Sequence, residues 1–354
     1  MTLLLAEVMG EPVWMWGMFL TLVLGLLAFD LGVLHRHPHE IGPRESLLLS
    51  IFYIGLGLLF GLWIWLMLGA QAAMLYVTGF VVEKSLALDN VFVIAVIFSY
   101  FAIPKELQHR VLIYGILGVI VLRGLMIGAG TAIVSQFEWV LYGFAAFLVF
   151  SGIRMLVARE QDFDVASNPV LRLSCKWLPL TPALHGHRFF VRSGPHLLAT
   201  PLFLTLLMIE TADVIFAIDS IPAIFAITTE PYLVYTSNIF AILGLRALYF
   251  VLVVMIDRFC YLKGALSLVL VFIGSKIFLS DLFGLEKFPP TLSLTITLAL
   301  LAGGILLSLL VSRPPAAAID SGSGQAPDEE EHFVAQQAGT FGISPDSASS
   351  NLRR

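Results

Sequence analysis

The sequence predicts an all-α fold, a polytopic bundle of about nine transmembrane helices that includes two inverted three-helix repeats. The first observation behind this prediction is composition, since 58% of the 354 residues are hydrophobic and 13% are charged. With a mean hydropathy of +0.91, the chain has more apolar surface than a soluble core of this length can bury. The other two observations are the spacing of its apolar runs and an internal repetition.

The apolar runs are long enough to cross about 30 Å of hydrocarbon as helices. They lie at residues 14–34, 46–68, 74–101, 110–130, 137–157, 198–228, 232–256, 263–282 and 291–311. Lys and Arg gather in alternate loops, and Lys287 is the one basic residue in the loops assigned to the outside. Because cytoplasmic loops retain basic residues, we expect an outside N-terminus and a cytoplasmic C-terminus. Residues 1–13 lack the basic start of a cleavable signal peptide, so we expect the first span to remain.

These runs divide the chain into six parts. Residues 1–73 hold the first two spans, 74–157 the first repeat, 158–197 a cytoplasmic loop, 198–282 the second repeat, 283–311 the ninth span and 312–354 a cytoplasmic tail. The tail is rich in Pro, Ser, Gly and acidic residues and has no apolar periodicity, so we expect it to be disordered.

The internal repetition relates the third to fifth spans to the sixth to eighth. The matched segments are Glu83 to Asn90 with Asp213 to Ser220, Leu122 to Leu125 with Leu245 to Leu248, and Val149 to Arg154 with Val271 to Lys276. Because each repeat has three spans, the second must cross the membrane in the opposite sense. Inverted repeats of this kind are typical of secondary transporters, which bind their substrate at the repeat interface near the midplane.

Polar side chains at mid-bilayer depth mark the candidate site. The residues we single out as ion ligands are Glu83, Asp89, Asn90, Glu210, Asp213, Asp219 and Ser220. Each buried charge costs roughly 2.5–3.5 kcal/mol on insertion scales, so the five carboxylates need compensation. One interpretation is a bound divalent cation. The other is a set of ion pairs with Lys84, Arg123, Arg246 and Lys276 that fixes helix packing.

The types of candidate ligand limit which cation the site could bind. The histidines and cysteines lie outside the spans or at their inner margin, whereas carboxylate, amide and hydroxyl oxygens suit Mg²⁺, Ca²⁺ and Mn²⁺. Residues seven apart share a helix face, which aligns Glu83 with Asn90 and Asp213 with Ser220. Asp219 is turned away from that face, and we expect Pro222 to break the helix there and free a carbonyl beside it.

One further acid lies at the inner end of the first span. Asp30, in the run Phe29-Asp30-Leu31-Gly32, is interpreted as a proton relay, a second ion site or an interfacial helix cap.

Several motifs resemble the TerC/Alx family of bacterial membrane proteins, within the group of LysE-like exporters. They are Phe29 to Val33, Glu83 to Leu86 followed by Asp89-Asn90, His185 to Arg192, Glu210 to Pro222, Ile224 to Thr228 and Thr236 to Tyr249. The resemblance covers about residues 14–310. It implies a protein of the bacterial cytoplasmic (inner) membrane whose intramembrane acids map onto Glu83, Asp89, Glu210, Asp213 and Asp219.

The resemblance also implies export of Mn²⁺, for manganese homeostasis or for metalation of exported proteins, and a link to tellurite resistance. We expect Mn²⁺, exchanged for protons, as the transported ion rather than a prosthetic group, and Ca²⁺ or Mg²⁺ as the alternatives. The expected surroundings are the lipid bilayer, and we expect no nucleic-acid partner and no enzymatic activity. The alternatives are a membrane-embedded redox or metal-dependent enzyme, and a membrane scaffold for stress response in which the acids serve packing.

Overall fold

The computed structural model describes residues 7–32, 43–157, 165, 168–181, 184–193, 196–255, 261–283 and 288–311. Its helices are α1 (Val13–Gly32), α2 (Pro43–Tyr100), α3 (Lys105–Gln136), α4 (Trp139–Val157), α5 (Pro169–Trp177), α6 (Pro201–Ile227), α7 (Pro231–Ile242), α8 (Leu245–Met255), α9 (Leu262–Leu282) and α10 (Pro290–Val311). Two short antiparallel hairpins, β1 (Glu7–Val8) with β2 (Glu11–Pro12) and β3 (Phe190–Ser193) with β4 (His196–Ala199), complete these elements. The prediction of a helical bundle is confirmed.

The helices have the length and composition of membrane spans. In the described part of the chain, seven helices are long and apolar enough to cross a bilayer, or eight if α7 and α8 together form one bent span. Large apolar side chains such as Leu66, Leu125 and Leu310 are exposed on the outside of the bundle. In water this exposure would be unfavourable, but in lipid it is the expected surface. The chain is therefore a multi-pass integral membrane protein.

Helix α2 has 58 residues, but it is not one straight rod. Its backbone leaves the helical region at Gly69, with φ 88° and ψ 175°, a conformation that glycine adopts without steric cost. On either side of this point the two halves lie against each other, because the Tyr76 hydroxyl donates to the carbonyl of Gly57 at 3.0 Å. Two predicted spans, 46–68 and 74–101, thus correspond to α2. The total of nine spans stays a prediction.

The predicted span 232–256 is a broken helix. α7 ends at Ile242, α8 begins at Leu245, and the pair is bent by 43°. Gly244 lies at the break with φ +81°, a left-handed conformation that favours glycine. The break leaves carbonyls at the end of α7 and in the turn after it without intrahelical partners, and the Lys84 ammonium donates to two of them, Ala241 O at 2.9 Å and Leu243 O at 3.2 Å.

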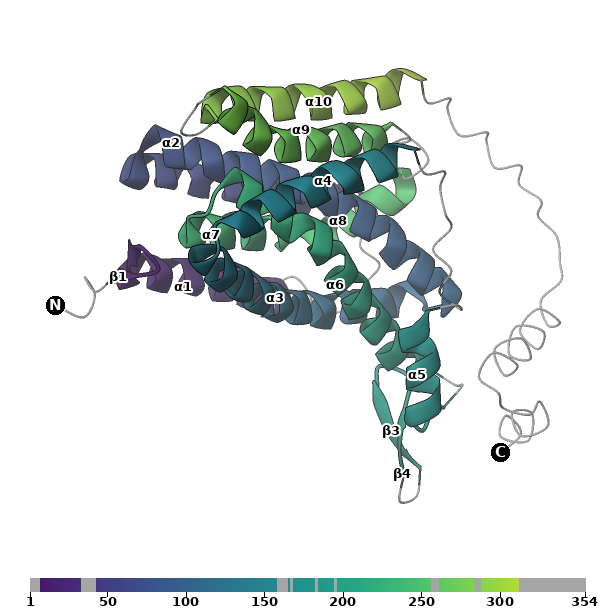
Figure 1. The fold of residues 1–354 in the computed structure, drawn as a ribbon. Helices are drawn as coiled ribbons and strands as arrows, with labels where there is room; N and C mark the ends of the chain where they lie inside the picture. Colours follow the sequence, from purple (N-terminus) through teal and green to yellow (C-terminus); the bar gives the residue numbers. More distant parts are fainter. Residues whose placement is uncertain are drawn as a thin grey trace.

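α6 and α7 form the centre of the bundle. Figure 1 shows α6 running diagonally through the bundle, from the region of α4 and α7 to α5 and the β3–β4 hairpin. The last part of α6, residues 220–227, is buried throughout, and so are Thr236, Ser237 and Asn238 of α7. Polar groups on these two helices therefore lie away from lipid.

α4 and α9 meet in a reciprocal contact. A Cβ on Gly152 would lie 2.8 Å from the carbonyl oxygen of Ser267, and a Cβ on Gly274 would lie 2.6 Å from that of Ala145. Gly152 and Gly274 occupy equivalent positions in the predicted repeats, as do the two residues whose carbonyls they approach. A two-fold relation between the repeats would produce such a contact, but the relation of the repeats as wholes stays a prediction.

The predicted cytoplasmic loop, 158–197, contains structure that the sequence analysis did not predict. Asn168 caps α5 by accepting a hydrogen bond from the backbone nitrogen of Val170 at 2.9 Å, and β3 begins at Phe190. The predicted disordered tail, 312–354, lies outside the described residues.

Candidate functional site

A buried arginine connects the predicted ligands. Arg123 of α3 is 1% exposed and forms ion pairs with Glu83 of α2 and Asp213 of α6. Its Nη2 donates to Asp213 Oδ1 at 3.0 Å and its Nε to Asp213 Oδ2 at 3.3 Å. Nη1 also donates to Ser220 Oγ at 3.1 Å and to Asn238 Oδ1 at 3.2 Å. We call Glu83, Asp213, Ser220 and Asn238 the oxygen cage.

The cage is assembled by helix geometry. Asp213 and Ser220 are seven residues apart on α6, so both point to the same side, as predicted. Glu83 comes from the second half of α2 and Asn238 from the short helix α7, so three elements surround one guanidinium. Two carboxylates face one positive charge, which leaves the group with a formal charge of −1 in a buried position. Buried charge of this kind is retained where it is paired and hydrogen-bonded.

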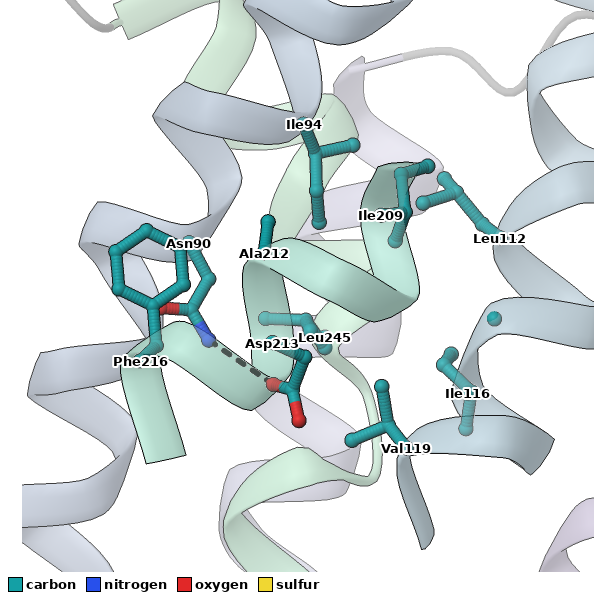
Figure 2. Close-up of a pocket in the computed structure, with 11 residues that line it drawn as sticks. Asn90, Ile94, Leu112, Ile116, Val119, Ile209, Ala212, Asp213, Phe216 and Leu245 are labelled. Carbon is teal, nitrogen blue, oxygen red and sulfur yellow. Dashed lines mark hydrogen bonds between the residues drawn. The ribbon is translucent and has the colours of Figure 1, made fainter. Parts of the chain in front are cut away.

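A cavity of about 20 Å³ adjoins the cage, with room for about one water molecule or one ion. Its walls come from α2 and α3 on one side and from α6 and Leu245 of α8 on the other, which places it between the two predicted repeats. Figure 2 shows its two polar side chains, with the Asn90 amide nitrogen donating to Asp213 Oδ1 at 3.4 Å. The other Asp213 oxygen points toward Val119 in this view.

Glu210 faces α3. A Cβ on Gly118 would lie 2.1 Å from Glu210 Oε1, so this carboxylate fits only because residue 118 has no side chain. Its Oε2 atom is buried and has no hydrogen-bond partner among the described residues. Glu210 is three residues before Asp213 on α6, which brings the two carboxylates to neighbouring positions on one helix face.

Asp219 lies apart from the cage. It is half-buried and accepts a hydrogen bond from Ser151 Oγ of α4 at 3.1 Å. Six residues separate it from Asp213, which is about 9 Å along a helix axis. The predicted break at Pro222 is wrong, because α6 continues through it to Ile227. A proline removes one backbone hydrogen bond without ending a well-packed helix, whereas the break at Gly244 uses a left-handed backbone.

The seven predicted ligands are thus distributed over several environments. Glu83, Asp213 and Ser220 bind Arg123, and Asn90 is next to them through Asp213. Glu210 and Asp219 have surroundings of their own, and the side chain of Asp89 lies outside what the structure describes. Among the described residues, no three His, Cys, Asp or Glu side chains are close enough together to hold a metal ion.

The other intramembrane bases have different partners. Arg246 forms an ion pair with Asp30 of α1 and lies 3.4 Å from His109 Nδ1, so Asp30 is part of a separate inner cluster. Lys84 binds the carbonyls at the α7–α8 break, and Lys276 donates to Ser293 Oγ at 3.4 Å. Among the described residues, ion pairing with an intramembrane acid, as the packing interpretation predicts, is therefore seen for two of the four bases, Arg123 and Arg246.

Sequence reasoning missed three residues at or beside the site. Asn238 completes the cage, Gly118 makes room for Glu210, and Ser151 binds Asp219. Asn238 had a visible signal, since the run Thr236-Ser237-Asn238 places three polar side chains inside an apolar span. Gly118 and Ser151 had none, because small residues are common where membrane helices pack.

Known proteins match most of the chain. A family model described as "Integral membrane protein TerC family" matches residues 68–316. A protein of Rickettsia bellii, described as an uncharacterized membrane protein, is 45% identical over 295 residues, which are 83% of this chain and 97% of its own. A membrane protein of Myxococcus xanthus, also described as uncharacterized, is 44% identical over 304 residues, 86% of this chain and 94% of its own.

A relative from Photorhabdus laumondii, provisionally named membrane-bound redox modulator Alx, is 46% identical over 283 residues, 77% of this chain and 88% of its own. No solved structure matches the chain. The family model covers well over half of the sequence, and these relatives are similar along most of both lengths. The chain therefore belongs to the TerC family of integral membrane proteins.

Proposed function

We propose that this protein exports a divalent cation, Mn²⁺ before Ca²⁺ or Mg²⁺, through the interface of its two repeats. The observation that carries the proposal is the oxygen cage, in which carboxylate, hydroxyl and amide oxygens from α2, α6 and α7 surround a buried positive charge. Oxygen ligands of this kind are those that hard cations prefer. An adjoining cavity of about 20 Å³ is large enough for one ion.

Transport in exchange for protons is part of the proposal. Buried acids that release a cation must be neutralised in another way, and protons can do this at several carboxylates between the repeats. Glu210 supports this role, because its buried Oε2 has no hydrogen-bond partner among the described residues. The proposed setting is the bacterial inner membrane, with the N-terminus outside, the C-terminus in the cytoplasm and Mn²⁺ entering from the cytoplasm.

The first test is Mn²⁺ flux into sealed inside-out vesicles. We would compare the wild type with Asp213→Asn, Asp219→Asn and Asp89→Asn at matched expression, with Ca²⁺ and Mg²⁺ as competitors. Asp281→Asn, at an exposed acid of α9, is the matched control. We expect Asp213→Asn to lower flux at least about tenfold, since it removes one of two charges that would hold the ion. Wild-type flux in Asp213→Asn and Asp219→Asn would show that these acids do not carry the ion.

Proton exchange has its own test. An ionophore that collapses the pH gradient across the vesicle membrane should slow Mn²⁺ flux. Full-rate flux without a pH gradient would remove proton coupling and leave the cation site unaffected.

A second candidate function is a membrane scaffold for stress response, tellurite resistance included, in which the acids only fix packing. The closed ion pairs of Arg123 with Glu83 and Asp213, and of Arg246 with Asp30, favour it. A triple variant that removes all three charges at similar size, Glu83→Gln with Arg123→Gln and Asp213→Asn, separates the two functions. A scaffold should tolerate the triple variant and retain tellurite resistance in cells, whereas Mn²⁺ transport should be lost.

The name of the Photorhabdus laumondii relative suggests a third function, modulation of a redox process in the membrane. A redox centre with an optical spectrum would be visible in the purified protein, and reduction with dithionite would change that spectrum. No change in the visible range would argue against a flavin, haem or iron–sulfur group.

A further inference from the structure

We infer that Arg123 is an internal competitor for the transported cation, and that its guanidinium fills the oxygen cage when no metal is bound and leaves when one enters. This inference rests on the proposed function, because it assigns a role to a residue at the same site. It goes beyond that function by explaining how a strongly acidic site can release its ion.

The first argument is that the guanidinium already uses the oxygens that a metal would need. Its nitrogens lie 3.0–3.3 Å from Asp213 Oδ1 and Oδ2, Ser220 Oγ and Asn238 Oδ1, and it also binds Glu83. A small divalent ion needs ligand oxygens at about 2.0–2.6 Å on all sides. In the structure the guanidinium of Arg123 occupies the space between these oxygens, so a metal can be held there only after Arg123 has moved out.

The second argument is charge. With Arg123 in place, two carboxylates and one guanidinium give the cage a formal charge of −1. Adding a dication without removing Arg123 would bring two cations into contact in a buried position, where repulsion is much stronger than in water. Replacing Arg123 by the dication instead leaves the cage neutral. Exclusive occupancy is therefore the arrangement that the charges favour.

The third argument is the state of the empty transporter. Two uncompensated carboxylates inside a bilayer would be costly, and the cost would resist any movement of the site between the two sides. Arg123 removes this cost, since it is 1% exposed and makes a bidentate contact with Asp213. A side chain tethered at the site can return as soon as the ion leaves, which lowers the metal affinity and speeds release.

Equilibrium Mn²⁺ binding to the purified full-length protein tests this inference. We would measure free Mn²⁺ by electron paramagnetic resonance in titrations of the wild type, Arg123→Gln and Arg246→Gln. Arg246→Gln is the matched control, because it removes an equally buried arginine that is paired with an acid outside the cage. We expect Arg123→Gln to bind Mn²⁺ at least about tenfold more tightly and to turn over more slowly, and Arg246→Gln to stay within about twofold of wild type.

An Arg123 that only fixes helix packing predicts unchanged or weaker Mn²⁺ binding in Arg123→Gln. Either result would overturn the inference. If the variant does not fold without metal, the second measurement is its yield of monodisperse protein with and without 1 mM Mn²⁺ during purification. Recovery by Mn²⁺ supports the inference, and failure to recover overturns it.

The same titration separates this inference from the proposed function. If neither the wild type nor Arg123→Gln binds Mn²⁺, Ca²⁺ or Mg²⁺, the proposed function is refuted, and the competitor role is refuted with it. A wild type that binds Mn²⁺, with Arg123→Gln binding it at unchanged affinity, would refute the competitor role alone.

Discussion

The contact between α4 and α9 depends on two glycines, and replacing either one by alanine should weaken it. A Cβ on Gly274 would lie 2.6 Å from Ala145 O, and a Cβ on Gly152 would lie 2.8 Å from Ser267 O. Both obstacles are backbone atoms of the facing helix, so no side chain can rotate away. The two helices would have to move apart, and close packing would be lost along the contact.

The structure gives both the size of the effect and its controls. Overpacking of this kind costs about 1–3 kcal/mol, while alanine regains up to about 1 kcal/mol of helix propensity over glycine. Gly143→Ala in α4 and Gly264→Ala in α9 keep the propensity gain, because a Cβ at either position meets nothing within 4 Å. Each test variant should therefore unfold about 1–3 kcal/mol more easily than the control in its own helix.

Thermal unfolding in detergent, followed by the loss of monodisperse protein, measures this difference. With roughly 2–4 °C for each kcal/mol, both test variants should melt several degrees below their controls. Test variants that melt together with the controls would refute the packing of α4 against α9 through these glycines. The same result would also remove the reciprocal α4–α9 contact as support for the repeat.

Three further substitutions should have separate effects. Gly118→Ala should lower Mn²⁺ flux in vesicles by about tenfold or more, because the added Cβ would displace the Glu210 carboxylate, an acid of the proposed pathway, by about 1 Å. Gly124→Ala is the control and should match wild type, because a Cβ at residue 124 meets no atom within 4 Å. Gly244→Ala should lower the melting temperature, because the backbone at residue 244 is left-handed, with φ +81°, and this conformation costs a residue with a Cβ about 1–2 kcal/mol. An unchanged melting temperature would contradict a left-handed break at this position. Lys84→Met should cost about 1–3 kcal/mol by leaving two carbonyls unpaired, and melting at the wild-type temperature would refute that role.

The fold class and the alignment of Asp213 with Ser220 could be predicted because they depend on local properties of the chain, whereas the use of these residues as ion ligands stays a prediction. Apolar length and composition indicate spans, and a seven-residue spacing on one helix correctly aligned Asp213 with Ser220. Intramembrane charges are rare enough that each one points to a partner or a function. The ion that the site takes, the orientation and the proton coupling stay predictions.

The partner of each charge could not be predicted. Arg123 was one of four candidate bases, and nothing in its own span indicates that it binds Glu83 and Asp213 while Arg246 binds Asp30. These contacts join residues 40 to 216 positions apart, and they depend on how each helix is rotated and tilted against its neighbours.

The position of the helix break could not be predicted from the sequence either. The sequence predicts a break at Pro222, yet α6 continues through it, and the chain breaks at Gly244 instead. A proline costs a helix one hydrogen bond, which packing on a buried helix can offset, whereas a left-handed glycine changes the direction of the chain. The sequence by itself determined that this chain is a membrane protein with acidic residues inside its apolar spans. Tertiary packing decided that two of those acids, Glu83 and Asp213, pair with Arg123, because charge pairing depends on distances across the bundle and not on spacing along the chain.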